Sequence, residues 1–461
     1  MEIKASREKY TVYLSDYIEY DTDIMKGGGT ERTELVQAVL DKAVEWGQLK
    51  LVVDGAVKTR RLKIHSNTTI ECLNSDCGFY LADDTNLPLL ENADPDIKVI
   101  RNKNINLCGG TYNFNCLHQK HHPEPGDPAE KLTTNTLIEA GYGFKGTPFE
   151  GYIEYDHHCF GFKFYGVENF TAKDITTVDQ RAWTMMMGNW KHVVFENVHI
   201  RLDNNMYGQN QDGLHFLGPG QFLTLRNIRG TSGDDFIALG PDEADCASKI
   251  SDVVIDGIHL ENADQGIRLL CRKNGALERV SINNVTGTYK SFGFIINPWF
   301  RESDSMGCYD GITFDNIDLV QHGHKYPYSY PFLFRLGGNV KNMTFRNIKH
   351  KFETESGVVF DIGSGYDEPF RVKESPAKIE NIRVEGALCT ASNGIKSEFM
   401  KTFTDVETVM LQGVITDGCA VSAENAKIDT LIASDVICGK LIEKDGMVNT
   451  VKTVNVLEKP E

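Results

Sequence analysis

The chain of 461 residues lacks long apolar runs and, over most of its length, lacks the apolar spacing of amphipathic helices. No stretch approaches the length of a membrane span, and the first residues contain no apolar core of a secretory signal. The eleven cysteines form no Cys-x-x-Cys pair and no even disulfide framework. These absences argue against a membrane-spanning or disulfide-stapled fold. They predict a cytoplasmic protein, or a secreted one whose signal peptide is not part of this sequence.

Positive charge is also scarce. The chain carries 48 lysines and arginines against 65 aspartates and glutamates, which gives a formal net charge of −17. An acidic chain of this kind is repelled by polyanions, so neither nucleic acid nor an anionic membrane is an expected partner. A highly anionic substrate would require a local cluster of basic residues.

A short repeated unit takes the place of helical periodicity. Six segments read apolar-x-apolar-x-Asn-apolar with small variations, and their Asn positions, one of them occupied by Gly, are 30, 30, 27, 32 and 31 residues apart. Weaker copies lie at 167–175 and 379–384. The six segments are Val193–Val198, Leu223–Ile228, Val253–Ile258, Val280–Val285, Ile312–Ile317 and Met343–Ile348.

Alternating apolar and polar residues within each unit predict short strands. Strands at a period near 30 with almost no helix between them predict a right-handed parallel β-helix, an all-β solenoid. A β-sandwich or a propeller is the alternative, but a propeller blade needs about 40 to 50 residues. The recurring Asn favours a ladder of turns, because Asn tolerates left-handed backbone and its amide bonds neighbouring groups.

We expect a single domain over residues 1–461, because no Pro/Ser-rich linker divides it. Its N-terminal cap would lie at about 21–50, inserted loops at about 115–155 and regular coils at about 160–455. Within the cap, Glu31–Trp46 has the spacing of a short amphipathic helix that would close the end of the apolar column. Its predicted apolar face comprises Leu35, Val36, Val39, Leu40, Ala43 and Val44.

Two acidic segments stand out within the repeats: Asn210-Gln211-Asp212-Gly213 and Ser232-Gly233-Asp234-Asp235. Asp212 and Asp234 are 22 residues apart, somewhat less than one repeat, so we expect the three carboxylates to lie on adjoining coils. Paired carboxylates on a rigid scaffold are the minimal equipment for cleaving a glycosidic bond. Either segment alone is more typical of a turn, whereas the two together favour catalysis.

These motifs resemble those of glycoside hydrolase family 28, the polygalacturonase-like β-helix hydrolases. That family has an Asn-x-Asp-Gly segment followed one coil later by Gly-Asp-Asp, and here Gly233-Asp234-Asp235 follows in the same order. The resemblance covers about 21–297 and is sharp only over 183–239. It implies that Asp234 is the general acid and that Asp212 and Asp235 hold and deprotonate the attacking water, which gives inversion without a metal or other cofactor.

Two other family motifs are missing. The family's Gly-His-Gly corresponds best to Asp264-Gln265-Gly266, so Gln265 replaces the His. The family's Arg-x-Lys, which grips a substrate carboxylate, then falls near Gly293–Asn297 with both charges lost. If Arg268 is instead the family Arg, Leu270 replaces the Lys. Both alignments remove the Lys, so recognition of galacturonate is not expected from the motif.

Other residues are candidates for orienting groups or for contacts with substrate. Asn210 would orient Asp212, or only close its turn. His215 would contact substrate or be a structural His. Gln265 and Arg268 would line the neighbouring subsite. Arg268 would contact substrate or orient an Asp, with a surface salt bridge as the alternative. Trp299, in an expected loop, is the better candidate for stacking on a sugar ring, because Trp183 is as readily a core residue.

The histidines do not predict a metal site. His118, His121 and His122, with the later pair His157-His158, lack a matching carboxylate or cysteine pattern. We therefore predict no metal and no cofactor. The predicted partner is an oligosaccharide substrate, pectin-derived or related, and a homo-oligomer is compatible with the sequence.

The sequence thus predicts an inverting, metal-independent glycoside hydrolase. The long insertion and the expected cytoplasmic location favour exo action on short oligosaccharides. A β-helix polysaccharide lyase is one alternative, although it would need a Ca²⁺ cluster and an Arg or Lys base. A non-catalytic carbohydrate-binding or structural β-helix, such as a tailspike-like protein, is the other.

Overall fold

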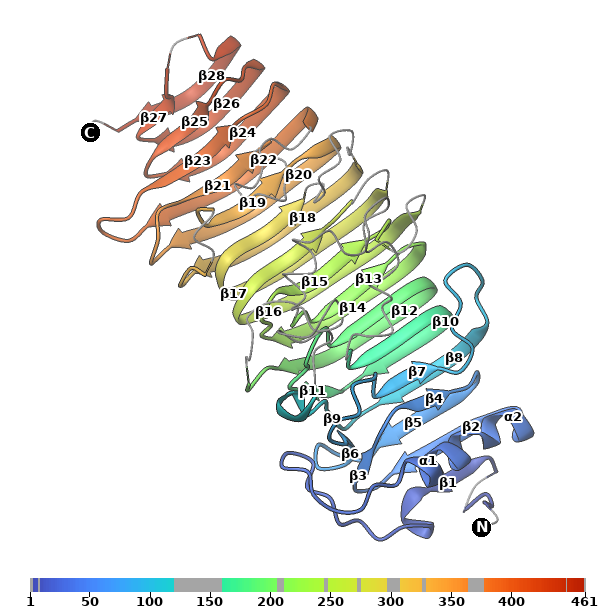
Figure 1. Cartoon of the computed structure of the whole chain (residues 1–461). Coiled ribbons are helices and arrows are strands. Elements are labelled where there is room, and N and C mark those ends of the chain that lie inside the picture. Colours follow the sequence, from blue (N-terminus) through green and yellow to red (C-terminus); the bar gives the residue numbers. More distant parts are fainter. Residues whose placement is uncertain are drawn as a thin grey trace, which may run out of the picture. The chain divides into compact units, whose positions relative to one another are not determined.

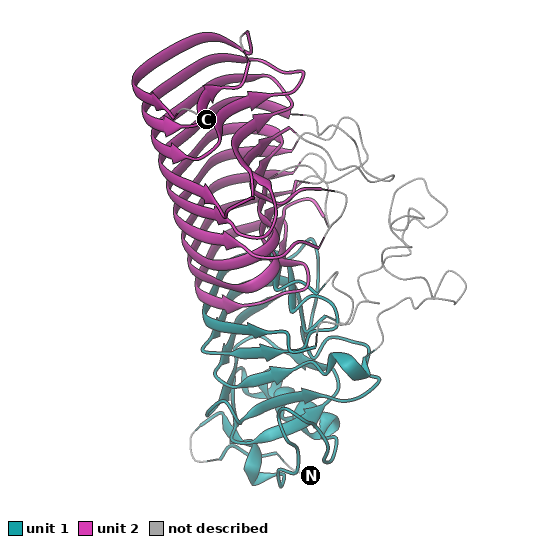
Figure 2. Ribbon diagram, turned by 90° about the vertical axis from the view of Figure 1, so that its left-hand side faces the viewer, with its two compact units in different colours: residues 1–215 teal, residues 216–461 magenta. Residues whose placement is uncertain are grey.

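The computed structural model describes residues 3–6, 9–119, 160–204, 211–243, 248–271, 275–296, 307–325, 329–363, 377–444 and 446–459. The chain divides into two compact units, residues 1–215 and 216–461 (Figure 2). In each unit parallel strands are stacked coil upon coil (Figure 1). Each unit is described by itself below.

All helices in the described residues belong to the first unit, whose strands are mostly short, with longer ones at β10 and β12. Its two α-helices are α1 (Thr33–Leu40) and α2 (Lys42–Trp46), and its 3-10 turns are η1 (Leu14–Asp16) and η2 (Cys116–His118). Its strands are β1 (Thr11–Tyr13), β2 (Leu49–Val53), β3 (Ala56–Thr59), β4 (Leu62–Ile64), β5 (Thr68–Cys72), β6 (Gly78–Leu81), β7 (Leu90–Asn92), β8 (Asn102–Cys108), β9 (Thr111–Asn113), β10 (Phe162–Lys173), β11 (Thr176–Val178) and β12 (Met185–Arg201).

The second unit is built from longer strands, and the division between the units falls inside β13 (Leu214–Leu217). Two of its strands, β16 (Lys249–Leu269) and β17 (Ala276–Ile296), run for 21 residues each. The others are β14 (Gly220–Gly230), β15 (Asp235–Gly240), β18 (Cys308–Gln321), β19 (Phe332–Leu336), β20 (Gly338–Phe352), β21 (Gly357–Ile362), β22 (Ala377–Ala391), β23 (Ser397–Thr402), β24 (Val406–Thr416), β25 (Cys419–Ala423), β26 (Ile428–Cys438), β27 (Lys440–Ile442) and β28 (Val448–Glu458).

The predicted repeat is the stacking period of the coils. In the second unit the residue before each repeated Asn or Gly pairs in register with its equivalent one coil on, all in parallel strands. The column runs Arg226, Asp256, Asn283, Asp315 and Arg346. The spacing counted from the sequence is therefore the spacing between stacked neighbours, and the prediction that equivalent positions stack is confirmed.

The recurring Asn forms the predicted ladder of turns. Asn284 and Asn316 have φ of 56° and 57°, in the left-handed region, and the Asn316 side-chain amide donates to Asn284 Oδ1 at 2.6 Å. In the first unit Asn169 donates to Asn104 at 3.0 Å, and Asn104 donates to Asn67 at 2.7 Å. Gly257 takes the same position with φ of 74°. Each coil therefore turns where a left-handed residue is required, and the amides link one coil to the next.

Aromatic rings stack along the coils of the second unit. Phe294, Phe334 and Phe360 lie in one column, with ring centroids 4.8 Å and 5.0 Å apart between successive rings. Phe314 and Phe345 form a parallel stack at 5.0 Å, and both rings meet Phe334 edge-on. All five side chains are buried. Burial of rings of this size contributes much of the stability of such a core.

The predicted N-terminal helix exists but is divided at Asp41 into α1 and α2. Val36, Val39 and Leu40 are buried as expected. The assignment of Val44 to the apolar face is wrong, since its side chain is 68% exposed. Asp41 itself keeps helical backbone, and Ala43 after it is buried in phase with Val39 and Leu40, so Val44 falls outside the buried face. No helix in the described ranges is long and apolar enough to cross a membrane.

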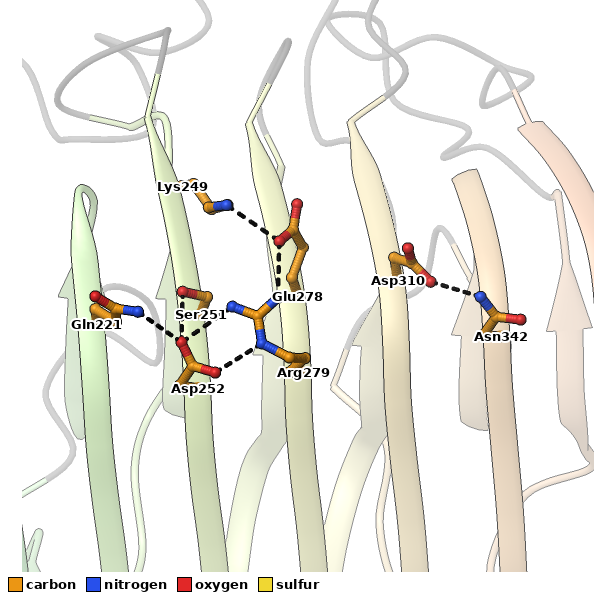
Figure 3. A network of polar contacts seen from close by, with 8 residues as sticks. All are labelled: Gln221, Lys249, Ser251, Asp252, Glu278, Arg279, Asp310 and Asn342. Carbon is orange, nitrogen blue, oxygen red and sulfur yellow. Dashed lines mark hydrogen bonds and ion pairs between the residues drawn. The ribbon is translucent and has the colours of Figure 1, made fainter.

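A surface network ties neighbouring coils together through charge (Figure 3). Arg279 on β17 makes two hydrogen bonds to the Asp252 carboxylate on β16, at 2.7 Å and 3.0 Å. Gln221 on β14 donates to the same carboxylate at 2.8 Å. The Arg279 guanidinium, followed by Gln221, holds the pKa of Asp252 well below its usual range. Because these groups are largely in water, we assign the network a role in register more than in stability.

One polar pair lies within the apolar interior. The Tyr289 hydroxyl lies 2.9 Å from Nε2 of His350, and both side chains are buried. Burial lowers the pKa of His350 from 6.5 to about 3, because the charged imidazolium is poorly solvated there.

We predict that replacing Asn316 by Ala destabilises the protein more than replacing it by Gly. Ala at positive φ costs roughly 1–2 kcal/mol, whereas Gly adopts this conformation freely and loses only the amide contacts. Denaturant midpoints of both variants would measure the difference. Equal destabilisation would mean that the amide bonds, not the left-handed backbone, determine the choice of Asn.

We predict that His350 makes stability depend on pH between about 3 and 6.5. In this window the unfolded chain binds a proton that the folded protein excludes, so the free energy of unfolding falls as pH falls, by roughly 1.4 kcal/mol per pH unit. Denaturant titrations at pH 7 and pH 5 would show the loss. A His350→Gln variant should lose less stability between these pH values than the parent; an unchanged difference would contradict the assignment.

Candidate active site

Each acidic segment lies next to the start of a short strand. Asp212 lies two residues before β13, in the first unit. Asp235 is the first residue of β15, in the second unit, and Asp234 directly precedes it.

In the first unit, Asp212 is bonded to His215. The carboxylate oxygen Asp212 Oδ2 lies 2.9 Å from the imidazole nitrogen His215 Nδ1. Both side chains are almost fully buried, with 5% of Asp212 and 3% of His215 exposed. The Trp183 ring stacks on the imidazole with centroids 3.8 Å apart and an angle of 12°. His215 therefore orients Asp212 and is itself fixed by Trp183, which covers one face of its ring. Of the two interpretations of Trp183, packing is the one that these contacts support.

The backbone around Asp212 is held from the preceding coil. Thr184 N donates to the Asp212 carbonyl oxygen at 2.8 Å. The side-chain amide of Gln180 donates to the same oxygen at 3.3 Å, and Gln211 in turn donates to the Gln180 carbonyl oxygen at 2.7 Å. Gln180 and Gln211 are fully buried. Neither glutamine was singled out from the sequence, where an isolated Gln carries no signal.

In the second unit the adjacent carboxylates receive unlike partners. The Gln265 side-chain amide donates to Asp234 Oδ1, and the Gln265 backbone N donates to the Asp234 carbonyl oxygen at 3.3 Å. Arg268 Nη1 donates to Asp235 Oδ2 at 3.4 Å, with exposures of 9% and 6% for the two side chains. Asp235 and Gln265 pair in register between β15 and β16. Next to Gln265, Gly266 allows β16 to approach β17 closely, because a Cβ there would lie 2.3 Å from the carbonyl oxygen of Gly293.

Two lysines that the sequence analysis did not identify lie close to the acidic motif of the second unit. Asp264, 1% exposed, accepts from Lys290 Nζ at 2.5 Å and from Lys325 Nζ at 2.6 Å. Lys325 Nζ also donates to the carbonyl oxygen of Gly233 at 3.0 Å. Positive charge therefore gathers beside the acidic motif although the expected Arg-x-Lys is absent. Lys325 is 92 residues from Gly233, so no local pattern could have placed it there.

The coil after Gln265 and Arg268 continues with apolar residues. Phe292 pairs in register with Gln265, and Ile295 pairs with Arg268. Phe292 stacks on Phe332 with ring centroids 4.4 Å apart. Together with Ile295 these two rings form one buried cluster. Apolar neighbours lower the local dielectric constant around Arg268 and Asp235, which strengthens the attraction between these two charges.

Several predicted features lie outside the described residues. These are Asn210, Trp299, the histidines at 121, 122, 157 and 158, and most of the expected insertion at 115–155. Within the residues that the structure describes, no group of three or more His, Cys, Asp or Glu side chains is arranged to hold a metal ion. The nine cysteines in those residues are free thiols.

We predict that Arg268→Met lowers the free energy of unfolding by about 3 kcal/mol or more, because it leaves the buried Asp235 carboxylate without its cation. Adding Asp235→Asn should recover part of the loss. Arg346→Met is the matched control, since Arg346 pairs with Glu385 at 2.8 Å on the surface and such pairs contribute about 1 kcal/mol or less. Equal losses in the two arginine variants, measured by denaturant unfolding, would contradict this assignment.

No protein-family model matches this sequence, and no curated protein matches it. Solved structures do resemble the fold. An exopolygalacturonase from Thermotoga maritima aligns with 98% of this chain and 93% of its own at 13% identity, with a TM-score of 0.50. An endo-xylogalacturonan hydrolase from Aspergillus tubingensis aligns over 84% and 94% at 12% identity, with a TM-score of 0.52.

The tailspike protein of E. coli bacteriophage HK620 is similar to the same degree. It aligns with 97% of this chain and 78% of its own at 10% identity, with a TM-score of 0.55. Identities this low establish the fold and leave the activity to the site. The predicted fold class is confirmed: the chain is a right-handed parallel β-helix, the architecture that these hydrolases and the tailspike share.

Proposed function

We propose that the protein is a glycoside hydrolase that cleaves an oligosaccharide by an inverting, metal-independent mechanism. The proposal is supported by the order and spacing of the acidic motifs, by the buried partners of their carboxylates, and by a fold that known polygalacturonases also have.

The buried ion pair of Asp235 with Arg268 carries this proposal. Inverting hydrolysis needs one carboxyl group that holds a proton and another that is ionised. Asp235 has the Arg268 guanidinium, and an opposite charge favours the ionised form. Asp234 receives a side-chain amide from Gln265, which is uncharged and can donate to either form of the carboxyl group. By the resemblance of its motif to that of family 28, Asp234 is assigned as the acid that protonates the leaving oxygen.

Asp212 is assigned, with Asp235, to hold and deprotonate the attacking water. Its bond to His215 fixes one oxygen of the carboxylate, and its burial keeps the group rigid. In this role His215 acts through Asp212 and has no need to touch the sugar. Asn210 and Trp299 stay proposed contacts, to Asp212 and to the sugar ring respectively.

A lyase is less well supported by the basic groups at the second-unit motif. Elimination needs an unprotonated Arg or Lys to remove a proton from the sugar. Lys290 and Lys325 both donate to Asp264, and Arg268 donates to Asp235, so all three are engaged as cations. Exo action remains a prediction that rests on the length of the insertion at 115–155.

We predict that Asp234→Asn abolishes release of sugar while folding is kept. Product analysis on a panel of pectic and neutral oligosaccharides would compare it with the parent and with Asp318→Asn, a surface carboxylate paired with Lys349. The parent and the Asp318 variant should release saturated products, and the Asp234 variant should lose about 100-fold or more in rate.

The products also decide between the alternatives. Monosaccharide or disaccharide release from one chain end would support exo action, and long products would contradict it. Unsaturated products that absorb in the near ultraviolet would identify a lyase. Binding without turnover, unaffected by Asp234→Asn, would identify a carbohydrate-binding protein.

A further inference from the structure

Lys325 reaches the acidic motif from far along the chain. Its ammonium group bridges the carbonyl oxygen of Gly233, the residue before Asp234, and the carboxylate of Asp264, the residue before Gln265. It is therefore bonded both to the loop that carries the proposed acid and to β16, which carries its amide partner.

The loop that bears Asp234 has three successive carbonyl oxygens engaged. Asp264 N donates to Ser232 O at 3.2 Å, and Gln265 N donates to Asp234 O at 3.3 Å. The Gly233 oxygen between them is bonded by Lys325 at 3.0 Å. The contacts to Ser232 and Asp234 come from the backbone of β16. The contact to Gly233 comes instead from the side chain of Lys325, which lies outside β16.

The segment that supplies Lys325 is itself anchored. His322 N donates to Tyr289 O at 2.7 Å, and Lys325 N donates to Ser291 Oγ at 3.0 Å. The buried Gln321 amide donates to Lys290 O at 3.1 Å. A lysine on a mobile loop would lose backbone as well as side-chain conformational entropy in making these contacts. Here the backbone is already fixed, so only the side-chain entropy is lost.

Asp264 explains why this lysine can be held at the motif. A carboxylate that is 1% exposed needs compensating charge, and it receives two ammonium groups on its two oxygens. Lys290 contacts Oδ1, while Lys325 contacts Oδ2 and continues to Gly233. The two lysines thus share one anion, and Lys325 bonds the motif as well.

From these contacts we infer that Lys325 is a positioning residue for Asp234: it fixes the loop that carries the proposed acid, through Gly233 and Asp264. This inference rests on the proposed function for its effect on rate. Its structural part, the ordering of the loop, stands on the contacts alone.

The experiment compares Lys325→Met with Lys290→Met and Lys325→Arg. Both Met variants remove one cation from Asp264, and only Lys325→Met also removes the contact to Gly233. We expect Lys325→Met to lower kcat by about 10- to 100-fold with little change in KM, because a small displacement of the acid impairs proton transfer more than binding. Lys290→Met should lower kcat much less, and Lys325→Arg should restore part of the loss.

Hydrogen exchange, followed by mass spectrometry on peptides that cover residues 231–236, gives a second readout that does not need turnover. It should become at least tenfold faster in Lys325→Met than in Lys290→Met. Equal kcat and equal exchange in the two Met variants would overturn the inference. If the parent releases no sugar, the proposed function fails, and the exchange comparison alone decides whether Lys325 fixes the loop.

Discussion

Parallel pairing of successive coils in register is the constraint on which the rest of the structure depends. After about 30 residues each coil must return to the same position around the axis, one strand spacing further along it. The turn at Asn284 and Asn316 meets this requirement with left-handed backbone and with an amide that bonds the next coil. Once the register is fixed, Phe294, Phe334 and Phe360 necessarily stack, because they occupy equivalent positions of successive strands. The ladder of turns and the column of rings are thus two consequences of one periodicity.

The same register assembles the chemistry of the second unit. Gln265 stands opposite Asp235 because β15 and β16 are paired, and its side chain reaches Asp234. Arg268, three residues further along β16, reaches the Asp235 carboxylate. Residues about 30 apart in the chain therefore become partners without any loop having to fold over them. Rigid strands hold Gln265 and Arg268 accurately, which suits groups that must position the carboxylates beside them.

Charge is distributed unevenly over this acidic chain. A net charge of −17 gives no hint of local positive charge, yet Lys290, Lys325 and Arg268 all lie at the second-unit motif. Each of them is paired with a buried or nearly buried carboxylate, so the local balance is closer to neutral than the chain as a whole. Buried carboxylates require such cations, because an isolated buried charge costs several kcal/mol. Composition reports the average over the surface, and the site is an exception to that average.

The sequence by itself determined the period, the strand character of the repeat and the order of the acidic motifs, because each is a local pattern that the backbone must obey. The positive φ of Asn316 and the pairing of Arg226 with Asp256 follow directly from it. It did not reveal that Val44 is exposed, because apolar spacing does not show how much of a helix face the neighbouring elements cover. Only the tertiary structure brought His215 onto Asp212 as an orienting group and stacked it on Trp183. Only it brought Lys325 to Gly233, since a contact across 92 residues depends on how an anchored loop returns over the coils and leaves no periodic trace in the sequence.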